Sequence, residues 1–73
     1  MQVHEHRGFT IEVRKSGDGY VPEVWRKGRL LHAARNGDSA DGLFPGHAQA
    51  AEAARAWIDH AYPPGRVKYF GEV

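Results

Sequence analysis

The sequence predicts an α+β domain in which a three-stranded antiparallel sheet is followed by one C-terminal helix, in the order β-β-β-α. Three observations support this fold. Residues 9–14 alternate strictly between apolar and polar side chains, glycine-containing turns separate them from two further strand-like segments, and residues 47–61 are rich in alanine. The chain has 73 residues and no cysteine, which predicts one domain over residues 1–73 without disulfides. Its core is expected within residues 7–62, with a C-terminal extension at residues 63–73.

The three predicted strands are joined by two short turns. Residues 9–14 (FTIEVR) form the first strand, and the SGDG segment after it forms a turn because glycine accepts positive φ. The second strand, residues 20–26, contains Pro22, which cannot donate a ladder hydrogen bond and therefore requires a sheet edge or a bulge. The following Lys-Gly pair suits a two-residue hairpin turn before the third strand at residues 29–34.

An alanine-rich helix is predicted at residues 47–61, after a polar, turn-rich loop at residues 36–42 (NGDSADG). Its larger apolar residues and several alanines fall on one stripe at helical spacing, which is expected to pack on the sheet. The stripe consists of Ala51, Ala54, Trp57, Ile58 and Ala61. A Pro-Pro-Gly sequence ends the helix, and residues 66–73 are either a short extra strand or a loose tail.

Pairing the strands across the two turns predicts which side chains face the helix. The covered face is expected to contain Phe9, Ile11, Val13, Tyr20, Val24, Leu31 and Ala33. The opposite face, which no other predicted element covers, is expected to contain Thr10, Glu12, Arg14, Val21, Glu23, Trp25, Leu30, His32 and Ala34. A slip of one residue in the pairing would exchange the two faces.

Self-association through the uncovered face is the first function that the sequence predicts. A domain of this size buries only about 60% of the surface of its unfolded chain, and its core contributes roughly 3–5 kcal/mol. An exposed apolar patch on so small a domain is typical of an interaction site. We therefore expect a non-enzymatic interaction module that forms a homodimer or binds a protein partner, without a cofactor. The predicted interface residues are Val21, Trp25, Leu30 and His32.

Two other functions would use the same face. A nucleic-acid-binding module would place cations against phosphates and an exposed tryptophan against a base, although a net charge of +1 opposes this function. Its contact residues would be Arg14, Trp25, Lys27 and Arg29. An enzyme would use Glu12, Glu23 and His32 as acid–base groups, but a flat sheet offers no pocket that excludes water. No catalytic residue is therefore expected, and His32 is expected to neutralise the two carboxylates.

The five histidines do not predict a metal site. His4 and His6 would point in the same direction on a strand, but His47 and His60 lie at opposite ends of the predicted helix, and no thiolate is available. The N-terminal residues are expected to form a solvated segment. Residues 1–7 are polar and no apolar stretch reaches the roughly 20 residues of a membrane span. These features predict a cytoplasmic protein with no membrane partner.

The chain resembles a family of small bacterial β-β-β-α proteins of unknown function. The resemblance covers residues 7–60 and is carried by an Arg-Gly-Phe-x-Ile opening, a Gly-Tyr second strand and core positions. The matching residues are Arg7, Gly8, Phe9, Ile11, Gly19, Tyr20, Val24, Phe44, Ala51, Ala54, Trp57, Ile58 and Asp59. This resemblance implies the fold and no reaction. The layout is also similar to the N-terminal arm-binding domains of phage integrases and, through Asp18-Gly19-Tyr20, to HicB-type antitoxin domains, which implies DNA contact or an antitoxin-like regulatory role.

Overall fold

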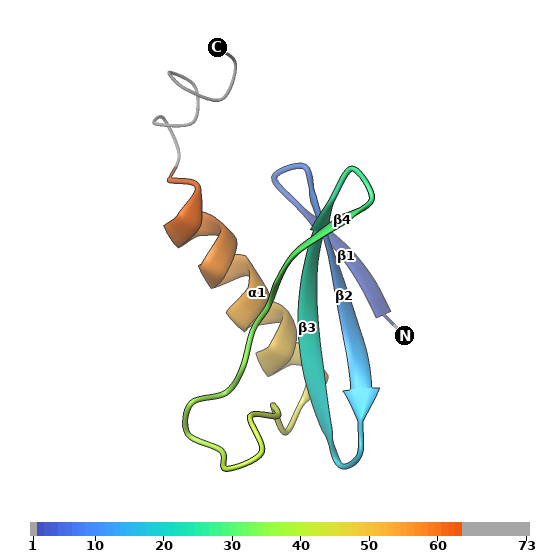
Figure 1. Cartoon of the computed structure of the whole chain (residues 1–73), viewed down its shortest axis with the longest axis vertical. Coiled ribbons are helices and arrows are strands. Elements are labelled where there is room, and N and C mark those ends of the chain that lie inside the picture. The colour runs from blue at the N-terminus through green and yellow to red at the C-terminus, as the bar shows by residue number, and fades with distance from the viewer. Residues whose placement is uncertain (1, 64–73) are drawn as a thin grey trace.

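The computed structural model describes residues 2–63 and contains one antiparallel sheet with a single helix packed on one face (Figure 1). Its elements are β1 (Gln2–His6), β2 (Phe9–Ser16), β3 (Gly19–Arg26), β4 (Arg29–Ala33) and α1 (His47–Ala61). The predicted α+β class is confirmed, but the prediction of three strands is wrong because β1 adds a fourth. The strands lie in sequence order, so each pairs with its neighbours along the chain. The extra strand considered for residues 66–73 lies outside the described residues.

The N-terminal strand β1 pairs along β2 instead of forming a solvated end, and His4 lies opposite Ile11. Arg7 and Gly8 make the connecting turn with φ values of 53° and 86°. Positive φ at both central residues is what a two-residue hairpin turn of type I′ requires. β1 has the sequence QVHEH, with valine as its one aliphatic residue. Apolar alternation therefore gave no signal for this strand.

The predicted register between β2 and β3 is confirmed, with Ile11 opposite Val24 and Val13 opposite Pro22. The requirement that Pro22 places on the sheet is met at the end of β4. The carbonyl oxygen of Pro22 accepts a hydrogen bond from the N–H of Ala34 at 3.0 Å. The proline nitrogen faces the same side as this carbonyl. Because β4 ends one residue earlier, the missing N–H falls at the edge of the sheet.

A β-bulge in β4 changes the predicted register between β3 and β4. Trp25 lies opposite Leu30 as expected, but Val24 then pairs with His32, so Leu31 is an extra residue on β4. The prediction that His32 lies on the uncovered face is therefore wrong, because the bulge turns it toward the helix. The faces of the neighbouring β4 residues are exchanged in the same way. Leu31 is 38% exposed, whereas Ala34 is buried.

The hydrophobic core lies between α1 and the two central strands. Its fully buried side chains are Phe9, Ile11, Val13, Val24, Ala50, Ala51, Ala54 and Ile58. The small alanines allow the helix to approach the sheet closely, and the aromatic side chains of Tyr20, Phe44, Trp57 and Tyr62 pack around this centre. Within residues 2–63, no helix has both the length and the apolarity needed to cross a bilayer.

The loop between β4 and α1 returns along the start of β3, where it is fixed by backbone hydrogen bonds. The N–H of Tyr20 donates to the carbonyl of Phe44 at 2.8 Å, and the reverse bond measures 2.9 Å. The preceding residue, Gly19, is buried beneath this loop. A Cβ atom built on Gly19 would lie 2.5 Å from the Cβ atom of Leu43. A glycine is therefore required here by the close approach of the loop.

Candidate functional site: the open face of the sheet

The open face of the sheet is the face turned away from α1. Among residues 2–63, α1 is the element that packs on the sheet from outside, and it contacts β2 and β3 through the opposite face. Strand alternation places the following residues on the open face: Val3, Glu5, Thr10, Glu12, Arg14, Val21, Glu23, Trp25, Leu30 and Ala33. The open face thus mixes aliphatic and aromatic residues with charged ones.

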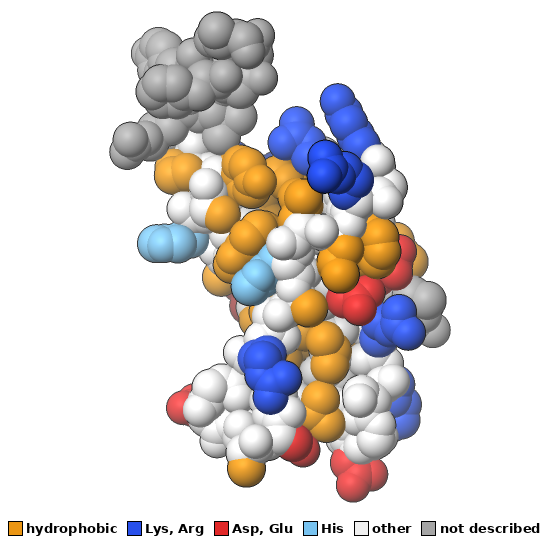
Figure 2. All heavy atoms as spheres, viewed as in Figure 1, with side chains coloured by type: hydrophobic (Ala, Val, Ile, Leu, Met, Phe, Trp, Pro, Cys, Tyr) orange, Lys and Arg blue, Asp and Glu red, His pale blue; other side chains and the backbone are white. Residues whose placement is uncertain are grey.

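The apolar part of the open face is centred on Trp25, which lies between Thr10 of β2 and Leu30 of β4. Leu30 is 49% exposed, and Val3, which lies on the same face in the other edge strand, β1, is 58% exposed. Figure 2 shows apolar side chains beside charged groups along this side of the molecule. Three of the predicted interface residues, Val21, Trp25 and Leu30, therefore share a face, whereas His32 does not.

Two glutamates form the polar centre of the open face. Glu12 lies directly opposite Glu23, an arrangement of like charges that is destabilising unless one of them is compensated. The guanidinium of Arg14 lies 3.7 Å from the Glu23 carboxylate, and the indole N–H of Trp25 donates to the same carboxylate at 3.3 Å. Arg14 thus takes the neutralising role that the sequence suggested for His32. Within residues 2–63, Glu12 makes no ion pair or side-chain hydrogen bond.

The predicted acid–base trio does not assemble. His32 stacks on Trp57 on the helix side, with ring centroids 4.4 Å apart and an interplanar angle of 7°. The two carboxylates remain together on the open face, with no imidazole beside them among the described residues. The sheet therefore separates the three groups on which acid–base catalysis would depend.

The four predicted nucleic-acid contacts also lie on different surfaces. Arg14 and Trp25 belong to the open face, whereas Lys27 lies in the turn between β3 and β4. Arg29 is the cross-strand partner of Arg26, whose guanidinium lies 4.9 Å from the centre of the core Phe9 ring. Because cross-strand partners share a face, Arg29 is on the helix side. These four residues therefore do not form one contact surface.

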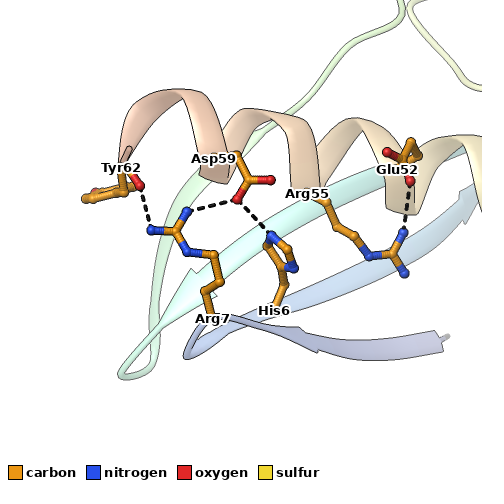
Figure 3. Close-up of polar contacts among 6 residues, drawn as sticks. All are labelled: His6, Arg7, Glu52, Arg55, Asp59 and Tyr62. Carbon is orange, nitrogen blue, oxygen red and sulfur yellow. Dashed lines mark hydrogen bonds and ion pairs between the residues drawn. The ribbon is translucent and has the colours of Figure 1, made fainter. Parts of the chain in front are cut away.

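A group of polar contacts that the sequence did not reveal ties the first hairpin to the end of α1 (Figure 3). Arg7 donates to the Asp59 carboxylate at 2.8 Å and to the carbonyl oxygen of Tyr62 at 2.7 Å. The imidazole of His6 lies 3.0 Å from the same carboxylate oxygen. The hydrogen bond from His6, followed by that from Arg7, lowers the pKa of Asp59 below its ordinary value.

The histidine pair of β1 points toward the helix, in a common direction as predicted, but the two rings have different partners. The Nε2 atom of His4 lies 2.8 Å from the Nε2 atom of His47 at the start of α1, so one ring donates and the other accepts. Tyr20 lies edge-on to His47 with ring centroids 6.1 Å apart. Residues 2–63 contain no group of three side chains placed to hold a metal ion.

A shallow hollow of about 270 Å³ lies near the start of α1, at the opposite end of the molecule from the Arg7–Asp59 contacts and beneath the loop after β4. Its polar lining includes Asp18, Asn36, Ser39 and Asp41. Asp41 accepts hydrogen bonds from the Ser39 hydroxyl and from the N–H of Leu43, which lower its pKa below the ordinary value. Asn36, Ser39 and Asp41 are thus engaged in holding the loop.

No protein-family model matches this chain, and neither a curated protein nor a solved structure matches it. The resemblances noted from the sequence therefore stay predictions.

Proposed function

We propose that this protein is a non-enzymatic interaction domain that forms a homodimer through the open face of its sheet. The observation that carries this proposal is the apolar pair formed by Trp25 and Leu30 on a sheet face that α1 leaves uncovered, with exposed Val3 on β1 of the same face. Leu30 and Val3 are 49% and 58% exposed, and burying such side chains is favourable by about 25 cal/mol for each Å² of apolar area.

The dimensions of the sheet set the strength expected for the dimer. Four strands spaced by about 4.8 Å, each about 20 Å long, give a projected area on the order of 400 Å² per partner. This area is near the low end for specific interfaces, which bury about 800 Å² of accessible surface per partner in the standard case. We therefore expect a reversible dimer with a dissociation constant in the micromolar range, roughly −8 kcal/mol.

The charges of the open face are compatible with two-fold symmetry. The side chain of Arg14 is 55% exposed, and on the open face Arg14 is the next residue of β2 after Glu12. With a two-fold axis through the open face, any contact between a group of one copy and a group of the other occurs twice. In this arrangement Arg14 of one copy approaches Glu12 of the other, which removes the like-charge repulsion left within each sheet.

Sedimentation equilibrium from about 1 µM to about 1 mM tests the proposal, because this range spans the expected dissociation constant. We expect the apparent mass to rise from the 8.1 kDa of one chain toward twice that value. Leu30→Arg places a charge in the patch at a position that is already half exposed, so folding is expected to survive while dimerisation weakens at least tenfold, about 1.4 kcal/mol.

The matched control is Ala56→Arg, which adds the same charge on the exposed side of α1 and is expected to dimerise like the wild type. A wild-type chain that stays monomeric over the whole concentration range contradicts the proposal. Equal weakening in both variants also contradicts it, since the effect would then come from net charge and not from the open face.

A further inference from the structure

The turn between β3 and β4 concentrates positive charge at one end of the molecule. Arg26 and Arg29 are directly opposite each other across this hairpin, and Lys27 lies in the turn between them. Like charges opposite each other on neighbouring strands are destabilising. None of these three cations has an acidic partner among residues 2–63. An anion bound here would relieve this repulsion.

Among residues 2–63, the neighbouring groups leave this charge uncompensated. The turn of the first hairpin lies at the same end of the sheet (Figure 1), and its Arg7 is paired with Asp59. The acidic residue on this side, Asp59, is already bound by Arg7 and His6. Figure 2 shows basic side chains gathered at this end of the molecule. The stem of Arg26 is positioned by Phe9, whose ring lies beneath its guanidinium, so part of the cationic group is held in place.

Aromatic side chains lie on the helix side near these cations. Trp57 is partly exposed; it stacks on His32 and lies edge-on to Tyr62, with ring centroids 6.1 Å apart. Tyr62 in turn packs against Phe9, the ring beneath Arg26, at 5.0 Å. The aromatic group is therefore continuous with the cationic hairpin through direct contacts. Partly exposed aromatic rings beside cations are the combination with which proteins hold unpaired bases and their phosphates.

We propose that this arginine–aromatic end binds single-stranded nucleic acid. Arg26, Lys27 and Arg29 contact the phosphates, and Trp57 and Tyr62 offer surfaces on which bases stack. A single strand is favoured over a duplex because unpaired bases expose the faces that such rings bind. The site lies on the helix side of the sheet, so it is separate from the open face proposed for dimerisation.

Fluorescence anisotropy with a labelled single-stranded oligonucleotide of about 12 nucleotides tests the cationic part. In Arg26→Gln/Arg29→Gln the side-chain stems are retained and two charges are removed. Each phosphate contact to a single strand contributes roughly a factor of five at ~0.1 M salt through counterion release, so two contacts predict about 25-fold weaker binding. The slope of log affinity against log salt is expected to fall by about 1.4.

The matched control is Lys15→Gln/Arg55→Gln, which removes two cations from other parts of the molecule and is expected to keep most of the affinity. A second measurement uses Trp25→Phe, which leaves Trp57 as the one tryptophan of the chain. Addition of the oligonucleotide is expected to quench its fluorescence. Leu30→Arg, designed to weaken the dimer, adds a cation next to Arg29 and is expected to bind the oligonucleotide at least as tightly as the wild type, so failure of one proposal is seen separately from failure of the other.

Three results would overturn the whole inference, and a fourth would overturn its aromatic part. The first is the absence of binding in low salt at high micromolar protein concentration. The second is an equal loss of affinity in the control variant, which would show that net charge alone is responsible. The third is binding to phosphatidylserine vesicles without binding to the oligonucleotide, which would assign the cations to a membrane surface. Binding without quenching of Trp57 would overturn the stacking role of the aromatic group.

Discussion

Gly19→Ala is expected to destabilise the protein although it adds only one methyl group. The new Cβ atom would lie 2.5 Å from the Leu43 Cβ atom and 3.0 Å from the Phe44 carbonyl oxygen. Backbone atoms and a Cβ atom cannot move away as a flexible side-chain end does, so the loop itself must shift. Forcing extra volume into a packed site costs about 1–3 kcal/mol, and the shift also strains the two backbone bonds between Tyr20 and Phe44.

This cost is large beside the stability expected for a domain of this size, roughly 3–5 kcal/mol. In urea denaturation followed by circular dichroism, a slope of about 1 kcal/mol/M would convert it into a midpoint lower by about 1–3 M. Gly37→Ala is the matched control, because a Cβ atom there meets nothing within 4 Å and the residue has no positive φ. The control is expected to be neutral or stabilised by up to about 1 kcal/mol. Equal midpoints for the two variants would refute the close-approach argument.

Three further predictions concern the contacts of α1. Ile58→Ala, at a fully buried position, is expected to cost about 2–5 kcal/mol and to leave the chain largely unfolded at 37 °C by circular dichroism. His32→Ala removes the stack on Trp57 and is expected to lower the unfolding free energy by about 1 kcal/mol in urea titrations; an unchanged midpoint would contradict this contribution. In the folded state the pKa of Asp59 is lowered from the ordinary value of 3.8. Ionised Asp59 therefore stabilises the fold fully above pH 3.8, and this stabilisation is lost as the pH falls through the lowered pKa of the folded state. Thermal melts between about pH 6 and pH 2 are expected to show a shallower acid decline for Asp59→Asn than for the wild type.

The central hairpin was predictable because two independent signals agree on it. Strict alternation in β2 fixed the face of Ile11, and the glycine-rich turn fixed its partner as Val24. The β4 bulge had no comparable signal, since Leu30 and Leu31 are both apolar and either could have faced the helix. The outcome is decided by packing, because the bulge brings His32 onto Trp57, a contact between segments far apart in the sequence.

The open face was therefore predicted in its β2 and β3 positions and missed in β1 and part of β4. Trp25 was placed correctly by pairing the strands across the two turns. Val3 was missed because β1, the strand that carries it, has almost no apolar pattern in its sequence. The Arg7–Gly8 turn and the contacts of Asp59 hold β1 against β2. Contacts such as that between Arg7 and Asp59 join residues 52 positions apart, and nothing in local patterning encodes them.

The order of the strands has a consequence for how the chain reaches its native state. Every ladder joins consecutive segments through a turn of two residues, so each hairpin closes a very short loop and forms in microseconds. The distant step is the arrival of the loop after β4 on β3 and of α1 on β2 and β3. We expect the rate-limiting barrier at this step, with the meander assembled early and the alanine-lined helix docking last.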